Sequence, residues 1–363
     1  MGPRQCGKTT FAKTELSGWR ILDMERPSDL AKLESDPEDF LERAQGKIVF
    51  DEAQRFPQIF PILRSIVDAQ RKNFGRFVLL GSVSPHLVRG VPESLAGRVG
   101  FLDMTPFIMG EVSSWRNLWF RGGFPQAHLE GDDSRRNEWF EAYTRTFIER
   151  DLQQLGIRVS SAQMRKLWSM LAHVHGGIWN ASEIGNSLGV NYHTVNRYVE
   201  ILEESFLMRR LSPYFVNIGK RLVKSPKIYL RDTGLLHHFL GISSAEILAE
   251  HPKRGASWEG FVVEQAISFV SLQHPEAQYF FWKTATGQEV DLLIKVGKTI
   301  LPIEIKTQGS PRKSDVKGLV ACLEDLRLRE GYVVRPQGET YSLGDGIRVV
   351  TLEELLKKLG KFF

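Results

Sequence analysis

The chain has little cysteine, no long apolar run and only a small excess of one charge. Cys6 and Cys322 are its only cysteines in 363 residues, and such a pair does not make the disulfide framework of a small secreted domain. No apolar run approaches the roughly 20 residues that cross a bilayer, and the N-terminus has no apolar signal segment. These absences favour a reducing compartment, and we expect the cytoplasm.

The charge balance also excludes few classes of binding partner. Lys and Arg number 48 against 43 Asp and Glu, which gives a net charge of +5 and a pI near 9.1. This excess permits a nucleic-acid partner but does not argue for one, because it describes the whole surface and not a patch. The length predicts two or three domains.

The hydrophobic pattern divides the chain into three parts. Residues 1–112 alternate expected strands (19–23, 47–51, 76–80 and 100–104) with expected helices (8–16, 57–70 and 92–96), which is typical of an α/β domain. Residues 113–250 contain helices up to about 176, then two short helices and a β-rich hairpin. Residues 251–363 return to mixed α/β.

A phosphate-binding loop lies at the start of the chain. Residues 2–9 fit the pattern G-x-x-x-x-G-K-[ST], whose glycines let backbone N–H groups converge on phosphate oxygens. Lys8 is expected to reach the β- and γ-phosphates, and the Thr9 hydroxyl to ligate Mg²⁺. ATP and Mg²⁺ are therefore the expected ligands, and the expected nucleotide contacts are Gly2, Pro3, Arg4, Gln5, Cys6, Gly7, Lys8, Thr9 and Thr10.

Polar residues at later strand ends would complete an ATPase site. The apolar strand 47–51 ends at Asp51, placed to hold Mg²⁺, and Glu52 follows as a base that activates the attacking water. At the end of the strand 76–80 a polar residue, for which we take Ser84, can sense the γ-phosphate or orient the water. Arg98 is a candidate arginine finger or sensor, acting in cis or in trans.

These segments resemble one family. GPRQCGKTT, IVFDEAQRFPQIFPILRSIVD, VLLGSVSPHL and ESLAGRV are similar to a family of predicted bacterial and archaeal AAA-type ATPases with a C-terminal domain of unknown function. FRGGFP, YTRTFIERDLQQLG and SPKIYLRDTGLLHHFLG fit it too, so the resemblance covers essentially the whole chain. It implies an ATPase of the AAA type and leaves the physiological task open.

One departure from that family concerns the central strand that leads into the phosphate loop. Here Met1 directly precedes Gly2, so the strand is absent from this sequence. Either the true start lies upstream or this is a shortened form. We expect the loop to lack its anchor in the sheet, which would expose unpaired strand edges.

Residues 177–232 have the spacing of a winged helix-turn-helix. A short helix at 181–188, a turn at 189–191 and a second helix at 192–202 are followed by the β-rich segment as a wing. Such domains bind DNA, or serve as lids or protein-docking modules. The residues expected to face outward are Tyr192, His193, Asn196 and Arg197, with Lys220, Arg221, Lys224 and Lys227 adding positive charge in the wing.

The C-terminal part carries acids on adjacent strands. Asp291 lies on one expected strand, and Glu304 and Lys306 share a face of the next because side chains alternate along a strand. Two carboxylates that hold Mg²⁺ beside a lysine suit phosphodiester cleavage. This D…E-x-K arrangement resembles the restriction-endonuclease-like superfamily, whose helical acid would here be Glu259, with Glu264 second.

Three hypotheses follow. The first is an AAA-type ATPase that acts as a nucleotide-driven switch on nucleic acid or a protein partner. The second is a Mg²⁺-dependent DNA nuclease regulated by the ATPase half. The third is a non-catalytic interaction or signalling protein with a crippled nucleotide site. A homo-oligomer is compatible with all three, and no membrane partner is expected.

Overall fold

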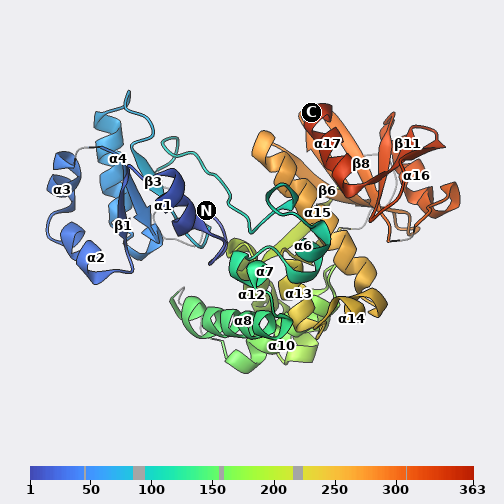
Figure 1. Cartoon of the computed structure of the whole chain (residues 1–363), viewed down its shortest axis with the longest axis horizontal. Helices are drawn as coiled ribbons and strands as arrows, with labels where there is room; N and C mark the ends of the chain where they lie inside the picture. The colour runs from blue at the N-terminus through green and yellow to red at the C-terminus, as the bar shows by residue number, and fades with distance from the viewer. Residues whose placement is uncertain (45, 85–94, 155–158, 216–223, 308) are drawn as a thin grey trace. The chain divides into compact units, whose positions relative to one another are not determined.

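The computed structural model describes the chain except residues 45, 85–94, 155–158, 216–223 and 308, and divides it into two compact units (Figure 1). Unit 1 comprises residues 1–106, 124–126 and 198–207, and unit 2 comprises residues 107–123, 127–197 and 208–363. Among the described residues, no helix combines the length and apolar character needed to span a membrane.

Unit 1 is built on a parallel sheet of β1 (Arg20–Asp23), β2 (Ile48–Asp51) and β3 (Phe77–Leu79), in that order. These are three of the four strands expected in this part of the chain. The central strand, β2, is buried along its whole length. Because the strands are parallel, their carboxyl ends meet at one edge, where α/β proteins bind ligands.

In the described part of the unit, the helices that accompany this sheet are α1 (Lys8–Glu15), α2 (Pro27–Glu34), α3 (Pro37–Arg43) and α4 (Ile59–Ala69). Ala12 of α1 packs with Val49 and Leu80. Helices α2 and α3 were not predicted from the sequence, although each has proline in its first turn, a favoured position at helix starts. A short 3₁₀ turn, η1 (Ala53–Arg55), follows β2.

The strand expected at 100–104 was wrong. This segment is irregular, and the Met104 N–H donates to the Met1 carbonyl at 2.6 Å. The Gly2 N–H donates to the Gly81 carbonyl at 3.2 Å, so the start of the phosphate loop is tied to the backbone on two sides. Of the helix expected at 92–96, residues 92–94 lie outside the described residues, and Ala96 lies in a turn.

The first part of unit 2 is helical, as expected for 113–176. Its elements are η3 (Met109–Glu111), α6 (Trp115–Arg121), α7 (Pro125–Leu129), α8 (Asp133–Thr146), η4 (Phe147–Asp151), α9 (Leu152–Gln154) and α10 (Ser161–His173), with α13 (Thr233–Phe239) and α14 (Ala245–Glu250) joining later.

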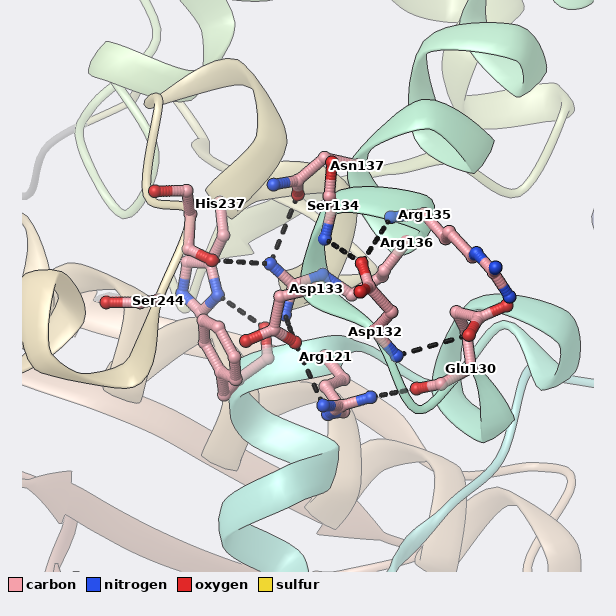
Figure 2. A network of polar contacts seen from close by, with 12 residues as sticks. Arg121, Glu130, Asp132, Asp133, Ser134, Arg135, Arg136, Asn137, His237 and Ser244 are labelled. Carbon is pink, nitrogen blue, oxygen red and sulfur yellow. Dashed lines mark hydrogen bonds and ion pairs between the residues drawn. The ribbon is translucent and has the colours of Figure 1, made fainter.

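A buried arginine connects these helices (Figure 2). Arg136 of α8 is 1% exposed, bonds Asp133 at 3.2 Å and the Ser243 carbonyl at 3.2 Å, and lies over the Phe120 ring. Asp133 also pairs with Arg121 of α6 at 2.9 Å. Burial lowers the pKa of Arg136, and Asp133 offsets part of that effect. The buried charge of Arg136 is thus stabilised by hydrogen bonds to groups in and between the surrounding helices.

The two helices expected between 181 and 202 are present. α11 (Ala181–Leu188) ends at Gly189, whose φ of 72° a β-carbon would disfavour, and α12 (Tyr192–Glu204) follows. A β-carbon on Gly185 would lie 2.7 Å from the Val190 carbonyl, so glycine permits the tight turn.

The hairpin expected as a wing belongs to a larger sheet. β4 (Met208–Pro213) pairs antiparallel with β5 (Lys227–Leu230), and β4 also pairs with β6 (Gln278–Lys283). The sheet has the order β10-β11-β9-β8-β7-β6-β4-β5. Its other strands are β7 (Glu289–Val296), β8 (Thr299–Ile305), β9 (Gly331–Arg335), β10 (Tyr341–Gly344) and β11 (Ile347–Thr351).

Helices cover this sheet in two separate apolar clusters. α15 (Arg254–Gln273) and α17 (Leu352–Phe362) pack on one side with Leu292, Ile303 and Val350, whereas α16 (Lys317–Leu326), preceded by η5 (Lys313–Val316), packs with Leu293 and Val333. Given the strand directions, β4, β6 and β8 end at the same edge at which β5 and β7 begin. The acids of the C-terminal part lie at this edge.

Candidate functional site

The phosphate loop has the backbone that its glycines predict. Gly7 has a φ of 106°, in the left-handed region, and precedes the first residue of α1. A β-carbon on Gly2 would lie 2.0 Å from the Met104 carbonyl oxygen. Both glycines are therefore required by the shape of the loop, whose backbone N–H groups lead into a helix N-terminus that favours anions.

Lys8 is buried within this loop. Its ammonium donates to the carbonyls of Gly2 and Pro3 at 2.9 and 2.8 Å. Across the described residues, it has no carboxylate within ion-pair distance. A buried ammonium with carbonyl partners and no counter-ion is suited to meet an anion, because an anion would supply the missing charge.

Thr9 and Asp51 meet at the expected magnesium position. The Thr9 hydroxyl donates to Asp51 Oδ2 at 2.6 Å, and the Glu52 N–H donates to Asp51 Oδ1 at 3.1 Å. Burial raises the pKa of Asp51, and the hydrogen bond from Thr9 offsets part of this. A hydroxyl beside a buried carboxylate is an oxygen donor set that suits Mg²⁺.

Glu52 is held by neighbours that the sequence analysis did not select. Its φ is 52°, uncommon for a residue with a side chain. Ser82 Oγ donates to Glu52 Oε1 at 2.7 Å, and the Gln54 side-chain amide donates to the other oxygen. The sequence analysis took Ser84, whereas Ser82 makes this contact. Both follow β3, and no local signal distinguishes them.

Ser84 and Arg98 have other partners. The Ser84 N–H donates to the Glu204 carbonyl at 2.7 Å. Arg98 makes two hydrogen bonds to Asp68, at 2.9 and 2.8 Å, and a third to the Ala96 carbonyl. Within the described part of the chain, neither side chain contacts Lys8 or Glu52.

The acids of unit 2 come together with the expected lysine. Lys306 Nζ lies 2.6 Å from Glu304 Oε1, and the Ile305 N–H donates to Asp291 Oδ2 at 2.8 Å. Glu259, from α15, accepts the Tyr229 hydroxyl at 2.6 Å. Lys227 pairs with both Glu259 and Asp291 and so joins the predicted residues into one group. We call Glu259, Glu289, Asp291, Glu304 and Lys306 the acid cluster.

Lys227 lies inside the acid cluster, so its expected role as a wing cation was wrong. It is 2% exposed, and its ammonium lies 2.8 Å from Glu259 Oε1 and 3.3 Å from Asp291 Oδ1, with Glu289 as a third partner. The sequence contained a signal: Lys227 begins the otherwise apolar strand β5, and a lysine there must be paired if the strand is buried.

The pKa values of the cluster follow its crowding. Burial and then the charge of Asp291 raise the pKa of Glu259 to about 7 and that of Glu304 to about 8. Burial lowers the pKa of Lys227, but Glu259 and its other acidic neighbours outweigh burial and raise it. Burial raises the pKa of Glu289, but Lys227 outweighs it, so that pKa is lowered.

Glu264, the second choice for the helical acid, lies elsewhere. It forms hydrogen bonds with Arg209 and with Arg231, the latter at 3.1 Å. Glu259 is therefore the acid of α15 that joins Asp291.

The outward residues of α12 are partly available. Tyr192, His193 and Arg197 are exposed, but Asn196 accepts the Trp179 indole N–H at 2.9 Å. Lys224 is exposed, and Lys220 and Arg221 lie outside the described residues.

Three family patterns match the chain in succession. Residues 1–113 match the AAA domain family, residues 112–246 match a domain of unknown function (DUF8612), and residues 254–355 match another (DUF4143). The N-terminal part thus has the AAA-family domain expected from the phosphate loop, within a mixed α/β protein.

Whole-chain relatives extend this finding. Uncharacterized protein Rv2008c of Mycobacterium tuberculosis and uncharacterized protein Mb2031c of Mycobacterium bovis are each 40% identical over 359 residues, covering 98% of this chain and 80% of theirs. The chain belongs to their family. The chain also resembles an uncharacterized Haemophilus influenzae protein, 21% identical over 60% of this chain and 61% of that protein. Protein VC1899 from Vibrio cholerae, at 11% identity, a TM-score of 0.22, and coverage of 94% and 95%, is too different to support an argument.

The two sites differ in how well they suit a ligand. The AAA domain fits Mg²⁺ and a nucleotide, because Lys8 has no counter-ion among the described residues and Thr9 adjoins Asp51. The acid cluster does not fit a divalent metal ion as it stands, because Lys227 lies among its carboxylates. Accordingly, the described residues contain no group of three or more His, Cys, Asp or Glu arranged to hold a metal ion.

Proposed function

We propose that this chain binds ATP with Mg²⁺ in its AAA domain, hydrolyses it, and acts as a nucleotide-driven switch. The observation that carries the proposal is the buried ammonium of Lys8, which has two carbonyl partners and, in the described part of the chain, no acid. Triphosphate oxygens would supply that charge, and the loop N–H groups would complete their recognition.

The residues around the loop have distinct roles in the proposal. Thr9 and Asp51 would hold Mg²⁺, which when bound would neutralise charge on the phosphates. Glu52 would accept a proton from the attacking water. Ser82 and Gln54 hold its carboxylate in place before reaction, so the base needs little rearrangement.

The proposed switch rests on the segment after β3. Ser82 bonds Glu52, and two residues later the Ser84 N–H bonds the Glu204 carbonyl at the end of α12. Residues 198–207 belong to the same compact unit as the nucleotide site. A change at Glu52 during hydrolysis would therefore reach α12 through three consecutive residues.

ATP turnover with Mg²⁺ tests the enzymatic part. Lys8→Ala should lose nucleotide binding, whereas Glu52→Gln should retain binding and lose turnover by about 100-fold or more. Nucleotide binding unchanged in Lys8→Ala would contradict the proposal. Double-stranded DNA added to the same assay shows whether nucleic acid stimulates turnover.

Hydrogen exchange tests the switch. A non-hydrolysable ATP analogue should change the amide protection of residues 198–204, and Lys8→Ala should abolish this change. Protection that is unaltered by bound analogue would leave an ATPase without the proposed link to α12.

Cleavage of DNA by unit 2 is the second candidate. The meeting of Glu259, Asp291, Glu304 and Lys306 favours it, and the position of Lys227 opposes it. Mg²⁺-dependent loss of a DNA substrate, abolished by Glu304→Ala and by Lys306→Ala, would establish this activity. We therefore rank it below the ATPase.

A further inference from the structure

The geometry points to Lys227 as a permanent internal cation that takes the place of a divalent metal ion in the acid cluster, so that this cluster binds no such ion. The inference concerns unit 2 alone and does not depend on the proposed ATPase. It assigns the D…E-x-K residues of this chain a structural, ionic role.

The three carboxylates around the Lys227 ammonium match its three hydrogen-bond donors. A lysine has three N–H donors, and Lys227 lies within ion-pair distance of three carboxylates from two elements: Glu259 of α15, and Glu289 and Asp291 of β7. An ion bound by all three carboxylates would have to lie where this nitrogen lies.

The charges of the acid cluster and of the lysines paired with it disfavour a further cation. The acid cluster has four carboxylates, and the lysines paired with them are Lys227, Lys283 and Lys306. With Lys227 in place, a divalent ion would enter beside a fixed positive charge at a few ångströms, where like charges repel strongly. Without Lys227, four carboxylates would face two lysines, which is a strong attraction for a divalent ion.

The backbone of Lys227 is held by strand pairing on both sides. Its backbone pairs with Leu211 of β4 on one side and forms a bridge with Ile178 on the other. The Ile228 N–H next to it donates to the Gly177 carbonyl at 3.2 Å. Its side chain passes the ring of Phe281, with the nitrogen 5.7 Å from the ring centre. The backbone that carries this ammonium is therefore fixed beside the cluster.

Glu304 would supply a further oxygen to an ion that takes the place of Lys227. It is 6% exposed, Lys306 binds Oε1, and Oε2 is buried without a hydrogen-bond partner among the described residues. In the chain without Lys227, that oxygen would be available to ligate a divalent ion.

Mn²⁺ binding to the full-length chain tests the inference. The chain carries Asp51→Asn throughout, so that the nucleotide site does not contribute, and free Mn²⁺ is measured by electron paramagnetic resonance without nucleotide. With Lys227 present, adding Asp291→Asn should leave Mn²⁺ binding unchanged. Lys227→Met should raise the Mn²⁺ affinity by about tenfold or more, and Asp291→Asn should abolish that gain.

Lys227→Arg is the matched control, because it keeps the positive charge and should gain no site. Mn²⁺ bound in an Asp291-dependent way by the chain that retains Lys227 would overturn the inference. A folded Lys227→Met chain without a new site would also overturn it. If Lys227→Met does not fold, Lys227→Gln is refolded with Mn²⁺. Failure of both variants to fold with Mn²⁺ would also overturn the inference, because the ion would then not replace Lys227.

Discussion

Each of the two units buries a lysine at the edge of its sheet, but in opposite surroundings. Lys8 in unit 1 bonds two backbone carbonyls and, across the described residues, meets no acid. Lys227 in unit 2 meets three carboxylates. The acids differ in the same way, since Asp51 and Glu52 have hydroxyl and amide partners while Asp291 has an ammonium.

This difference separates a binding site from an internal ionic contact. A buried charge without a counter-ion is costly, so a fold that retains one gains by binding a ligand of opposite charge. A buried charge that is already matched has no such need. Both groups contain acids and a lysine at a sheet edge, so residue type alone does not distinguish them.

Substitution of each buried lysine should give the largest difference in stability between the two units. Lys227→Met leaves buried carboxylates unmatched and should lower the free energy of unfolding by about 3–5 kcal/mol. Lys8→Met loses hydrogen bonds but strands no acid, and should cost only about 1 kcal/mol without nucleotide. Urea denaturation followed by circular dichroism measures both. Equal losses would mean that Lys227 is not the counter-ion that stabilises the cluster.

The two serines after β3 sharpen the account of unit 1. Ser82 positions Glu52, so Ser82→Ala should lower ATP turnover by about tenfold with nucleotide affinity retained. Ser82→Thr keeps the hydroxyl and should restore most of the rate. Ser84→Ala is the matched control, since its backbone N–H remains and turnover should stay near that of the parent chain. A loss confined to Ser84→Ala would instead favour the residue chosen from sequence.

The pH dependence of stability tests the crowding of unit 2. Folding raises the pKa of Glu304 from 4.5 to about 8, so its stabilising contribution is fully present below about pH 4.5 and is lost as pH rises through about 8. The free energy of unfolding should therefore fall between pH 5 and 8, by about 1 kcal/mol or more from this group. Glu304→Gln should flatten the fall, measured by urea titrations at each pH. A stability that rises over this range in the parent chain, with no change in Glu304→Gln, would contradict the account.

The geometry of the proposed nucleotide site was largely predictable because its sequence signals are local. The phosphate loop is one continuous segment, and Asp51 and Glu52 directly end a strand that the sequence reveals by its apolar run. Parallel strands bring such ends to one edge. The choice between Ser82 and Ser84 was not predictable, because it depends on where one side chain points in the folded unit.

Most residues of the acid cluster were predictable from the sequence, but the role of Lys227 among them was not. Asp291, Glu304 and Lys306 were predicted from the alternation of side chains along two strands, whereas Glu259 was implied by the resemblance to the restriction-endonuclease-like superfamily and Glu289 was not selected. Lys227 was assigned to a wing, because its partners Glu259 and Asp291 lie 32 and 64 residues away along the chain. The strand expected at 100–104 was wrong for a related reason: a strand requires a neighbour, and apolar residues alone do not supply one.

Substitution of Arg98 should have the smallest effect on ATP turnover. It tests whether the comparison between Lys8 and Lys227 extends to an arginine. The Arg98 guanidinium forms two hydrogen bonds with Asp68, so this arginine already has its counter-ion, as Lys227 has. Lys8 has none in the part of the chain that the structure describes. Asp68 correspondingly has a lowered pKa, first because of the hydrogen bond from Arg98. By the same reasoning Arg98 is not free to meet phosphate in this chain, and Arg98→Ala should change turnover by less than about twofold, against a loss on the order of 1,000-fold or more for an arginine finger. Asp68→Asn is the matched variant: it frees Arg98, and turnover that rises in Asp68→Asn but not in the double variant would show that the pair restrains a catalytic arginine.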